Sequence, residues 1–181
     1  MSGEARSAGP GIALAVLVGV SVTVLLGVYG KVHDPQFFSV NVAGFSSPVA
    51  VKSWLGSVAV LLAIGQVVSA LIMYGKAGIA APSWIGGVHA WAGRLAVLVS
   101  VPVAVHCLYA LGFQDTTTRV LAHSLFGCFF YGIFVTKMLL LTRKGLPGWV
   151  VPVAGGLTFT GLTGLWLTSS LWFFQNNGLT F

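Results

Sequence analysis

Acidic residues are almost absent from this chain of 181 residues, and charged residues of either sign are scarce. Three Asp and Glu stand against nine Lys and Arg, and 56% of the residues are hydrophobic. With a mean hydropathy of +0.94, this composition excludes an ordinary soluble globular domain. No Asp or Glu lies well inside a long apolar stretch, and no inverted repeat is apparent, which argues against a transporter or a proton pathway.

Motifs that hold several common cofactors are also missing. The two cysteines, Cys107 and Cys128, belong to no Cys-x-x-Cys-His or Cys-x-x-Cys sequence, which excludes covalent c-type haem and gives no sign of zinc or an iron–sulfur cluster. Without a Gly-x-Gly-x-x-Gly or Walker-type loop, a nicotinamide, flavin or nucleotide site is not expected. Nothing resembles a nucleic-acid-binding motif, so no nucleic-acid partner is expected. If the chain takes part in electron transfer, its electron donor must therefore be another protein or a small diffusible carrier.

Apolar stretches of about 20 residues recur along the chain, and each is long enough to cross a hydrocarbon core of about 30 Å. Their hydrophobicity is continuous and does not alternate, which favours helices over the strands of a barrel. We predict an all-α integral membrane protein that forms a single domain over residues 1–181, with a core four-helix bundle. Its five spans are expected at about 11–31, 53–75, 84–112, 117–142 and 149–174.

Basic residues in the short loops predict the orientation of these spans. One side of the membrane would hold Arg6, Lys76, Arg143 and Lys144, with Lys137 nearby. The other side would hold Lys31, Lys52 and Arg119, tempered by Asp34 and Asp115. This bias predicts a cytoplasmic N-terminus and an external C-terminus for a multi-pass protein of the cell (plasma or inner) membrane, in contact with membrane lipid.

Two histidines, His106 and His123, lie on either side of the polar turn 112–119, each inside an apolar run. Each is roughly two helical turns from the centre of the turn, so a helical hairpin would hold both imidazoles at one depth near the outer face. Neutral imidazoles at one depth can bind a haem iron from its two faces, and such bis-histidine ligation suits electron transfer. The alternative is that a histidine in a membrane helix simply hydrogen-bonds a neighbouring helix.

Glycines follow two of the histidines by four residues, Gly93 after His89 and Gly127 after His123. Positions i and i+4 share a helical face, so a missing side chain there would let a flat macrocycle lie against the backbone. Close helix packing through small residues explains the same pattern.

His89 lies 17 residues before His106, roughly 25 Å along a helix, so the two cannot bind one iron. A second haem would need another ligand near the depth of His89; Met138 is a weak candidate, and Met73, at the end of the second span, is another. Otherwise His89 would hydrogen-bond a propionate or a quinone, contact a partner, or share a haem with another subunit. Arg94, inside the third span, would pair with a propionate or quinone carbonyl, or anchor the helix at lipid phosphates.

The segments HAWAGRL at 89–95 and HSLFGCFFYG at 123–132 resemble the histidine-and-glycine helices of b-type membrane cytochromes, most closely the cytochrome b561 and ferric reductase-like group. The resemblance covers residues 53–142. It implies a bundle of about four helices that holds haem b through paired histidines, here His106 and His123, with His89 as a further ligand position. The chain lacks a fourth matched histidine, and this departure puts electron transfer across the membrane through two haems in doubt.

The sequence thus predicts a membrane-bound b-type cytochrome subunit that binds one haem b, or two. It would relay electrons between quinol or a partner redox protein and an external acceptor, as part of a redox or respiratory complex. Whether the chain itself is an enzyme stays open, since an electron-transfer subunit of an oxidoreductase complex need not turn over a substrate. The alternatives are a cofactor-free accessory or anchor subunit of such a complex, a histidine copper site, and a pathway through the membrane that uses His106, His123 and Arg94.

Overall fold

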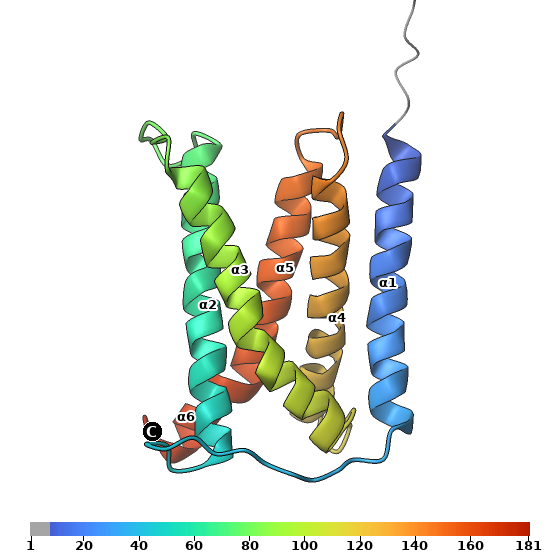
Figure 1. Ribbon diagram of the computed structural model, residues 1–181, viewed down its shortest axis with the longest axis vertical. Coiled ribbons are helices and arrows are strands. Elements are labelled where there is room, and N and C mark those ends of the chain that lie inside the picture. The colour runs from blue at the N-terminus through green and yellow to red at the C-terminus, as the bar shows by residue number, and fades with distance from the viewer. Residues whose placement is uncertain (1–7) are drawn as a thin grey trace, which may run out of the picture.

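Five long helical segments make up most of residues 8–181, the part of the chain that the computed structural model describes (Figure 1). They are α1 (Gly9–Val32), α2 (Pro48–Met73), α3 (Ile85–Val105) with the π-helix His106–Leu111, α4 (Thr118–Leu141), and α5 (Val150–Trp166) with the π-helix Leu167–Leu171 and α6 (Trp172–Asn177). Each segment is apolar and 24 to 28 residues long, enough to cross a membrane. The all-helical, five-span prediction is confirmed for the described residues, and Arg6 lies outside them.

Two helix ends differ by three residues or more from the sequence-based expectation. The second span begins at Pro48, because Ser47 caps the helix by accepting a hydrogen bond from the Ala50 N–H at 3.1 Å and proline suits the first helical turn. The last span continues to Asn177 through a π-helical stretch. Backbone hydrogen bonds there join residues five apart, in place of four as in an α-helix, so the chain remains helical.

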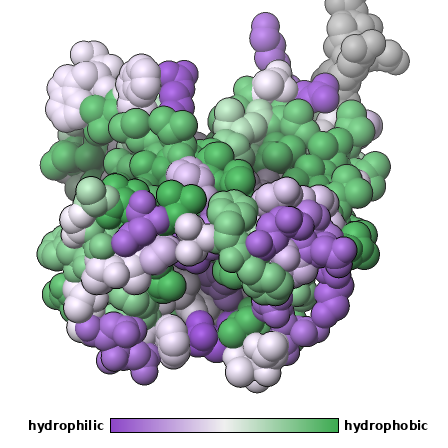
Figure 2. All heavy atoms as spheres, turned by 60° about the horizontal axis from the view of Figure 1, so that its bottom comes forward, coloured by the Kyte–Doolittle hydropathy of each residue, from purple (hydrophilic) through white to green (hydrophobic). Residues whose placement is uncertain are grey.

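Successive helices run in opposite directions, so the connections gather at two ends of the bundle (Figure 1). The segment 33–47, the turn 112–117 and the C-terminus lie at one end, which is called the C-terminal end below. α1 packs along α4, α4 along α5, and α3 along α2, while α2 also contacts α5. Figure 2, in which the C-terminal end is turned toward the viewer, shows many hydrophilic residues at that end and mainly hydrophobic residues on the visible flank.

α1 and α4 approach each other through two glycines that face two threonines. A Cβ added to Gly19 would overlap Thr136 Oγ1, and one added to Gly132 would overlap Thr23 Oγ1. Each threonine hydroxyl donates to the glycine carbonyl of its own helix, at 3.1 Å in both cases. In lipid the hydrophobic effect does not drive helices together. Close packing at small residues is therefore a main source of helix association there.

A small apolar core joins α2, α4 and α5. Its buried members are Ala59, Val60, Ala63, Phe130 and Leu162. Most other large apolar side chains are exposed on the flanks, where a membrane protein meets lipid. This core lies directly beside a cavity between the helices, because Ala59, Phe130 and Leu162 also line that cavity.

Candidate functional site

A cavity of about 280 Å³ lies between α2, α3, α4 and α5 in the half of the bundle nearest the C-terminal end. It extends from the 112–113 turn to Ser100 and Tyr131, whose hydroxyls hydrogen-bond at 3.0 Å. Its wall is mostly apolar, and its volume is near the lower end of the range of about 300–1,000 Å³ that is usual for ligand pockets. Its polar and sulfur-bearing lining residues include Lys52, Ser53, Ser100, Cys107, Arg119, His123, Ser124, Cys128, Tyr131, Ser169 and Ser170.

His123 lines this cavity, and its contacts determine which ring nitrogen carries the proton. Nδ1 of His123 lies 3.2 Å from Oγ1 of Thr168. The Thr168 hydroxyl has one hydrogen, which it donates to the Gly164 carbonyl at 2.7 Å, so its oxygen accepts the Nδ1 proton of His123. Nε2 is then unprotonated, and no side chain of the described residues hydrogen-bonds to it; the backbone carbonyl of Leu165, three residues before Thr168, is the other hydrogen-bond partner near the ring. A histidine that ligates a metal has this arrangement, with one nitrogen anchored as a donor and the other bare.

Two cationic side chains line the cavity together with His123. Arg119 belongs to the same helix as His123, and Lys52 belongs to α2. Arg119, one turn before His123 on α4, donates from Nη1 to the Thr168 carbonyl at 2.6 Å. Its guanidinium also lies over the Trp172 ring, 4.0 Å from the ring centroid. A ligand with an apolar body and an anionic end would therefore meet positive charge at the C-terminal end of the cavity.

His106 is at the expected depth but does not line the cavity. It is five residues from Leu111 at the end of its helical segment, and His123 is five residues from Thr118 at the start of α4. Nδ1 of His106 lies 3.3 Å from the Lys52 ammonium, and Nε2 lies 3.0 Å from the Phe38 carbonyl. Because an ammonium only donates and a carbonyl only accepts, His106 carries its proton on Nε2. Both of its ring nitrogens are thus bonded to the protein.

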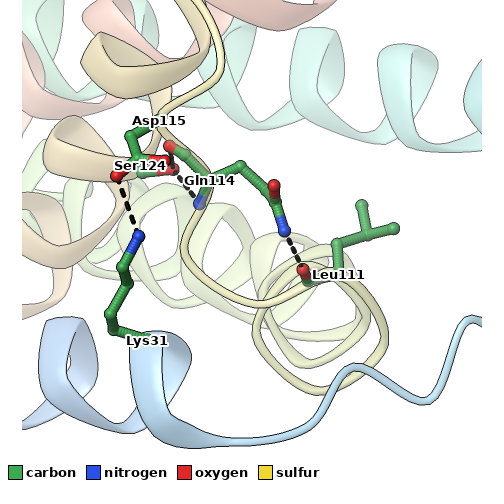
Figure 3. Close-up of polar contacts among 5 residues, drawn as sticks. All are labelled: Lys31, Leu111, Gln114, Asp115 and Ser124. Carbon is green, nitrogen blue, oxygen red and sulfur yellow. Dashed lines mark hydrogen bonds and ion pairs between the residues drawn. The ribbon is translucent and has the colours of Figure 1, made fainter.

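The turn between the two histidines is held by polar contacts that Figure 3 shows. The Ser124 hydroxyl accepts from the Gln114 N–H at 3.1 Å and donates to the Gln114 carbonyl at 2.8 Å. Gln114 Nε2 donates to the Leu111 carbonyl at 2.7 Å. Lys31, at the end of α1, pairs with Asp115 at 2.8 Å. These contacts fix the end of the third span relative to α4 and α1, and so the relative depth of the histidines.

The Lys31–Asp115 pair predicts a small acid-dependent loss of stability. The hydrogen bond from Lys31 lowers the pKa of Asp115 in the folded protein. The stabilisation by this pair is therefore complete above about pH 4, the ordinary pKa of aspartate. It is lost as the pH falls through the lower pKa of the folded state. Asp115→Asn should remove that acid dependence from thermal unfolding measured between about pH 7 and pH 3. The matched control is Asp34→Asn, and an equal effect of both changes would contradict the prediction. Both partners are exposed, so the effect is small.

The two glycines singled out in the sequence have different surroundings. Gly127 lines the cavity, and a Cβ added there would make an ordinary 3.7 Å contact with Leu165. Gly93 instead faces α2, where an added Cβ would lie 2.7 Å from Gln66 Nε2. Gly127 thus leaves open space beside His123, whereas the space beside Gly93 is filled by a side chain.

His89 lies in the other half of the bundle, away from the cavity. Its Nδ1 is 2.9 Å from the Ser69 hydroxyl, and its carbonyl accepts a hydrogen bond from Gln66 Nε2. The α4 residue that reaches this group is Lys137, whose ammonium is 3.5 Å from Gln66 Oε1. Met138 is 46% exposed on the flank of α4, so the structure does not bring it to His89.

Arg94 is exposed on α3, and its guanidinium lies 5.1 Å from the centroid of the Trp91 ring. It does not line the cavity. Cys107 and Cys128 are free and lie on the cavity wall.

The residues around the cavity fit haem b in four respects. The wall is apolar, His123 presents a bare nitrogen, Lys52 and Arg119 supply cations for propionates, and Gly127 leaves room beside the helix. The fit is incomplete at His106, because its ring nitrogens are bonded to the Phe38 carbonyl and to Lys52, and one of these contacts must break before a nitrogen is free to act as a ligand.

Thr168, Arg119 and Lys52 shape the site but do not stand out in the sequence as parts of it. The one available signal is the polar run Thr168–Ser170 inside an otherwise apolar stretch, since hydroxyl groups inside a membrane helix commonly bond to a neighbouring helix. Only the packing of α5 against α4 places that run beside His123.

The family comparison covers nearly the whole chain. A family described as "Family of unknown function (DUF6529)" matches residues 12–181. No curated protein and no solved structure matches the chain.

Proposed function

The chain belongs to the DUF6529 family, and we propose that this member is a membrane-bound b-type cytochrome subunit that relays single electrons through haem b. The observation that carries the proposal is His123, whose Nδ1 is anchored to Thr168 while its bare Nε2 belongs to a residue on the wall of an apolar cavity. Exposing an unpaired nitrogen inside a membrane helix is costly, and such groups usually mark function.

In this proposal His123 and His106 would bind the haem iron, and Lys52 and Arg119 would hold the propionates. Haem b bound by two imidazoles would supply one-electron chemistry. Arg119 is already fixed by Thr168 and Trp172, so its charge is preorganised at the C-terminal end of the cavity. Gly127 leaves room for the edge of a flat ligand beside α4.

His106 reaches the ligand position by a change of partners. Its side chain leaves the Phe38 carbonyl and the Lys52 ammonium, and that departure also frees Lys52 to pair with a propionate. The lost contact between Lys52 and His106 is thus offset by a new charge-assisted hydrogen bond from Lys52 to the propionate.

The proposed partners are quinol or a neighbouring redox protein as electron donor and an external acceptor, within a larger redox complex. The C-terminal end of the bundle faces the outside of the cell membrane in this proposal, because the connections at the other end carry Lys76, Arg143 and Lys144. The cavity is nearer the C-terminal end, a position from which an external acceptor can be reached.

The test is a pyridine haemochrome assay on the purified full chain, after expression with haem supplied and after reconstitution with haemin. We expect one haem b per chain and a low-spin spectrum with a sharp α-band on reduction. Metal analysis of the same sample separates iron from copper. A protein that stays colourless under both conditions would contradict the proposal.

A second candidate function, a cofactor-free accessory subunit of a redox complex, is favoured by one observation. Both ring nitrogens of His106 are bonded to protein groups, as expected for a histidine with a purely structural role. The colourless result named above is the outcome that this candidate predicts.

A further inference from the structure

Thr168 makes two contacts to α4 from one position on the last helical segment. Its hydroxyl lies 3.2 Å from Nδ1 of His123, and its carbonyl accepts from Nη1 of Arg119 at 2.6 Å. Thr168 belongs to the π-helix Leu167–Leu171, a type of helical irregularity that is frequent at functional sites. One residue therefore contacts both the histidine and the arginine that face the cavity.

The direction of the hydroxyl bond follows from the other contacts of Thr168. The hydroxyl hydrogen is directed to the Gly164 carbonyl at 2.7 Å, with the Leu165 carbonyl further away at 3.1 Å. Its oxygen can then only accept from His123. Removing the hydroxyl would take this acceptor from Nδ1 and leave the Leu165 carbonyl as the other acceptor near the ring, so the preference for the Nδ1-protonated tautomer would weaken.

The same arrangement occurs at His89, in the other half of the bundle. Ser69 donates to the Gly65 carbonyl at 2.7 Å, and its oxygen lies 2.9 Å from Nδ1 of His89. In both places a hydroxyl that bonds back to its own helix receives the Nδ1 proton of a histidine on another helix. The contact at Thr168 is therefore a repeated way of orienting imidazoles in this chain.

We infer that Thr168 is a positioning residue: its hydroxyl holds His123 in the Nδ1-protonated tautomer, so that Nε2 remains a bare nitrogen available to the cavity. As far as haem is concerned, the inference rests on the proposed function. The tautomer itself does not depend on haem, and it can be measured in the haem-free protein.

The test uses Thr168→Val, which keeps the shape of the side chain and removes the hydroxyl, and Thr168→Ser, which restores it. Thr158→Val is the matched control, because Thr158 makes the same bond to its own helix, to the Ala154 carbonyl at 2.7 Å, without a histidine partner. Nitrogen-15 NMR of histidine-labelled, haem-free protein reports which ring nitrogen of His123 carries the proton, with the signal assigned by the loss of that signal in His123→Ala.

We expect Nδ1 to be protonated in the wild type, in Thr168→Ser and in Thr158→Val, and protonation to shift toward Nε2 in Thr168→Val. An unchanged tautomer in Thr168→Val would overturn the inference, and so would an equal shift in Thr158→Val. If Thr168→Val does not fold, the comparison of Thr168→Ser with wild type decides: a shifted tautomer in the serine variant overturns the inference, because its hydroxyl is retained.

Haemin titration of the same variants separates this inference from the proposed function. Loss of an outer hydrogen bond to a metal-ligating histidine commonly lowers affinity by about 10- to 100-fold, and we expect that fall for Thr168→Val with recovery in Thr168→Ser. A tautomer that shifts as expected while no variant, wild type included, binds haem would support the role of Thr168 and contradict the cytochrome proposal. Haem binding that is unaffected by a shifted tautomer would overturn the role of Thr168 toward haem and leave the cytochrome proposal standing.

Discussion

His123→Ala should abolish haem binding, whereas His106→Ala should leave a haem that is still bound but no longer low-spin. The difference follows from the two tautomers: His123 has a bare Nε2 and lines the cavity, but His106 has both nitrogens bonded to Lys52 and Phe38. His123 is therefore ready to bind the haem iron before the cofactor enters, whereas His106 must first break a hydrogen bond to the protein. A haem with one imidazole has an open coordination position, so its spectrum changes although the haem remains.

The measurement is the haem content per chain together with the absorption spectrum of each purified variant. His33→Ala is the matched control, because His33 lies between Tyr29 and Tyr109 at ring-centroid distances of 4.9 and 4.8 Å, outside the cavity lining. That variant should keep both haem and spectrum. Full haem content in His123→Ala would refute the ligand assignment, and complete haem loss in both single variants would refute the difference between the two ligands.

Gly132→Ala should destabilise the fold by about 1–3 kcal/mol, the usual cost of forcing extra atoms into a well-packed contact. The added methyl would overlap Thr23 Oγ1 and lie 2.5 Å from the Gly19 carbonyl oxygen. A side-chain rotation cannot relieve a contact with backbone, so α1 must move away from α4. The helix α1 packs mainly on α4, and this movement would detach it from the bundle.

Thermal unfolding in detergent and protease access to α1 would measure this effect. Gly19→Ala should give the same result, because its added methyl would lie 2.5 Å from the Gly132 carbonyl oxygen. Gly65→Ala is the control, since nothing lies within 4 Å of the added atom. A Gly132→Ala protein as stable as Gly65→Ala would contradict the packing described for α1 and α4.

Filling the space beside His123 is expected to block haem without unfolding the protein. Gly127→Leu should lower haemin affinity roughly 5- to 150-fold, since overfilling a packed site costs about 1–3 kcal/mol. Gly127→Ala, with its ordinary 3.7 Å contact to Leu165, should behave like wild type. Haemin titration and thermal unfolding measure the two effects, and unchanged haemin affinity in Gly127→Leu would place the ligand elsewhere.

The depth of the two histidines was predictable, but the direction of their rings was not. Helix length and a short turn set how far His106 and His123 lie from the end of the bundle, and both depend on local sequence. The ring of His106 is directed instead by Phe38, which is 68 residues away along the chain. The proline at 102 and the π-helix that begins at His106 change the helical phase in a way that residue spacing alone does not reveal.

The expectation for His89 shows the same division. The sequence placed it at a different depth from His106, and the structure agrees, with Ser69 and Gln66 as its contacts. The sequence offered Met138 as its partner on α4, whereas the structure brings Lys137 to Gln66 and leaves Met138 on the flank. Neighbouring residues on a helix differ by about 100° in direction, so a spacing argument that is correct in depth can still select the wrong face.

By itself the sequence determined that the described part of this protein is helical, with five helices long and apolar enough to cross a membrane, because backbone groups in lipid must be satisfied within each span and composition marks the spans. It also determined which histidines share a depth. Only the tertiary structure decided that His123 faces a cavity with Thr168 behind it, while His106 faces the segment that covers the C-terminal end. Those contacts join helices that are far apart in the chain, and ring direction depends on the rotation of each helix against its neighbours, which no local pattern encodes.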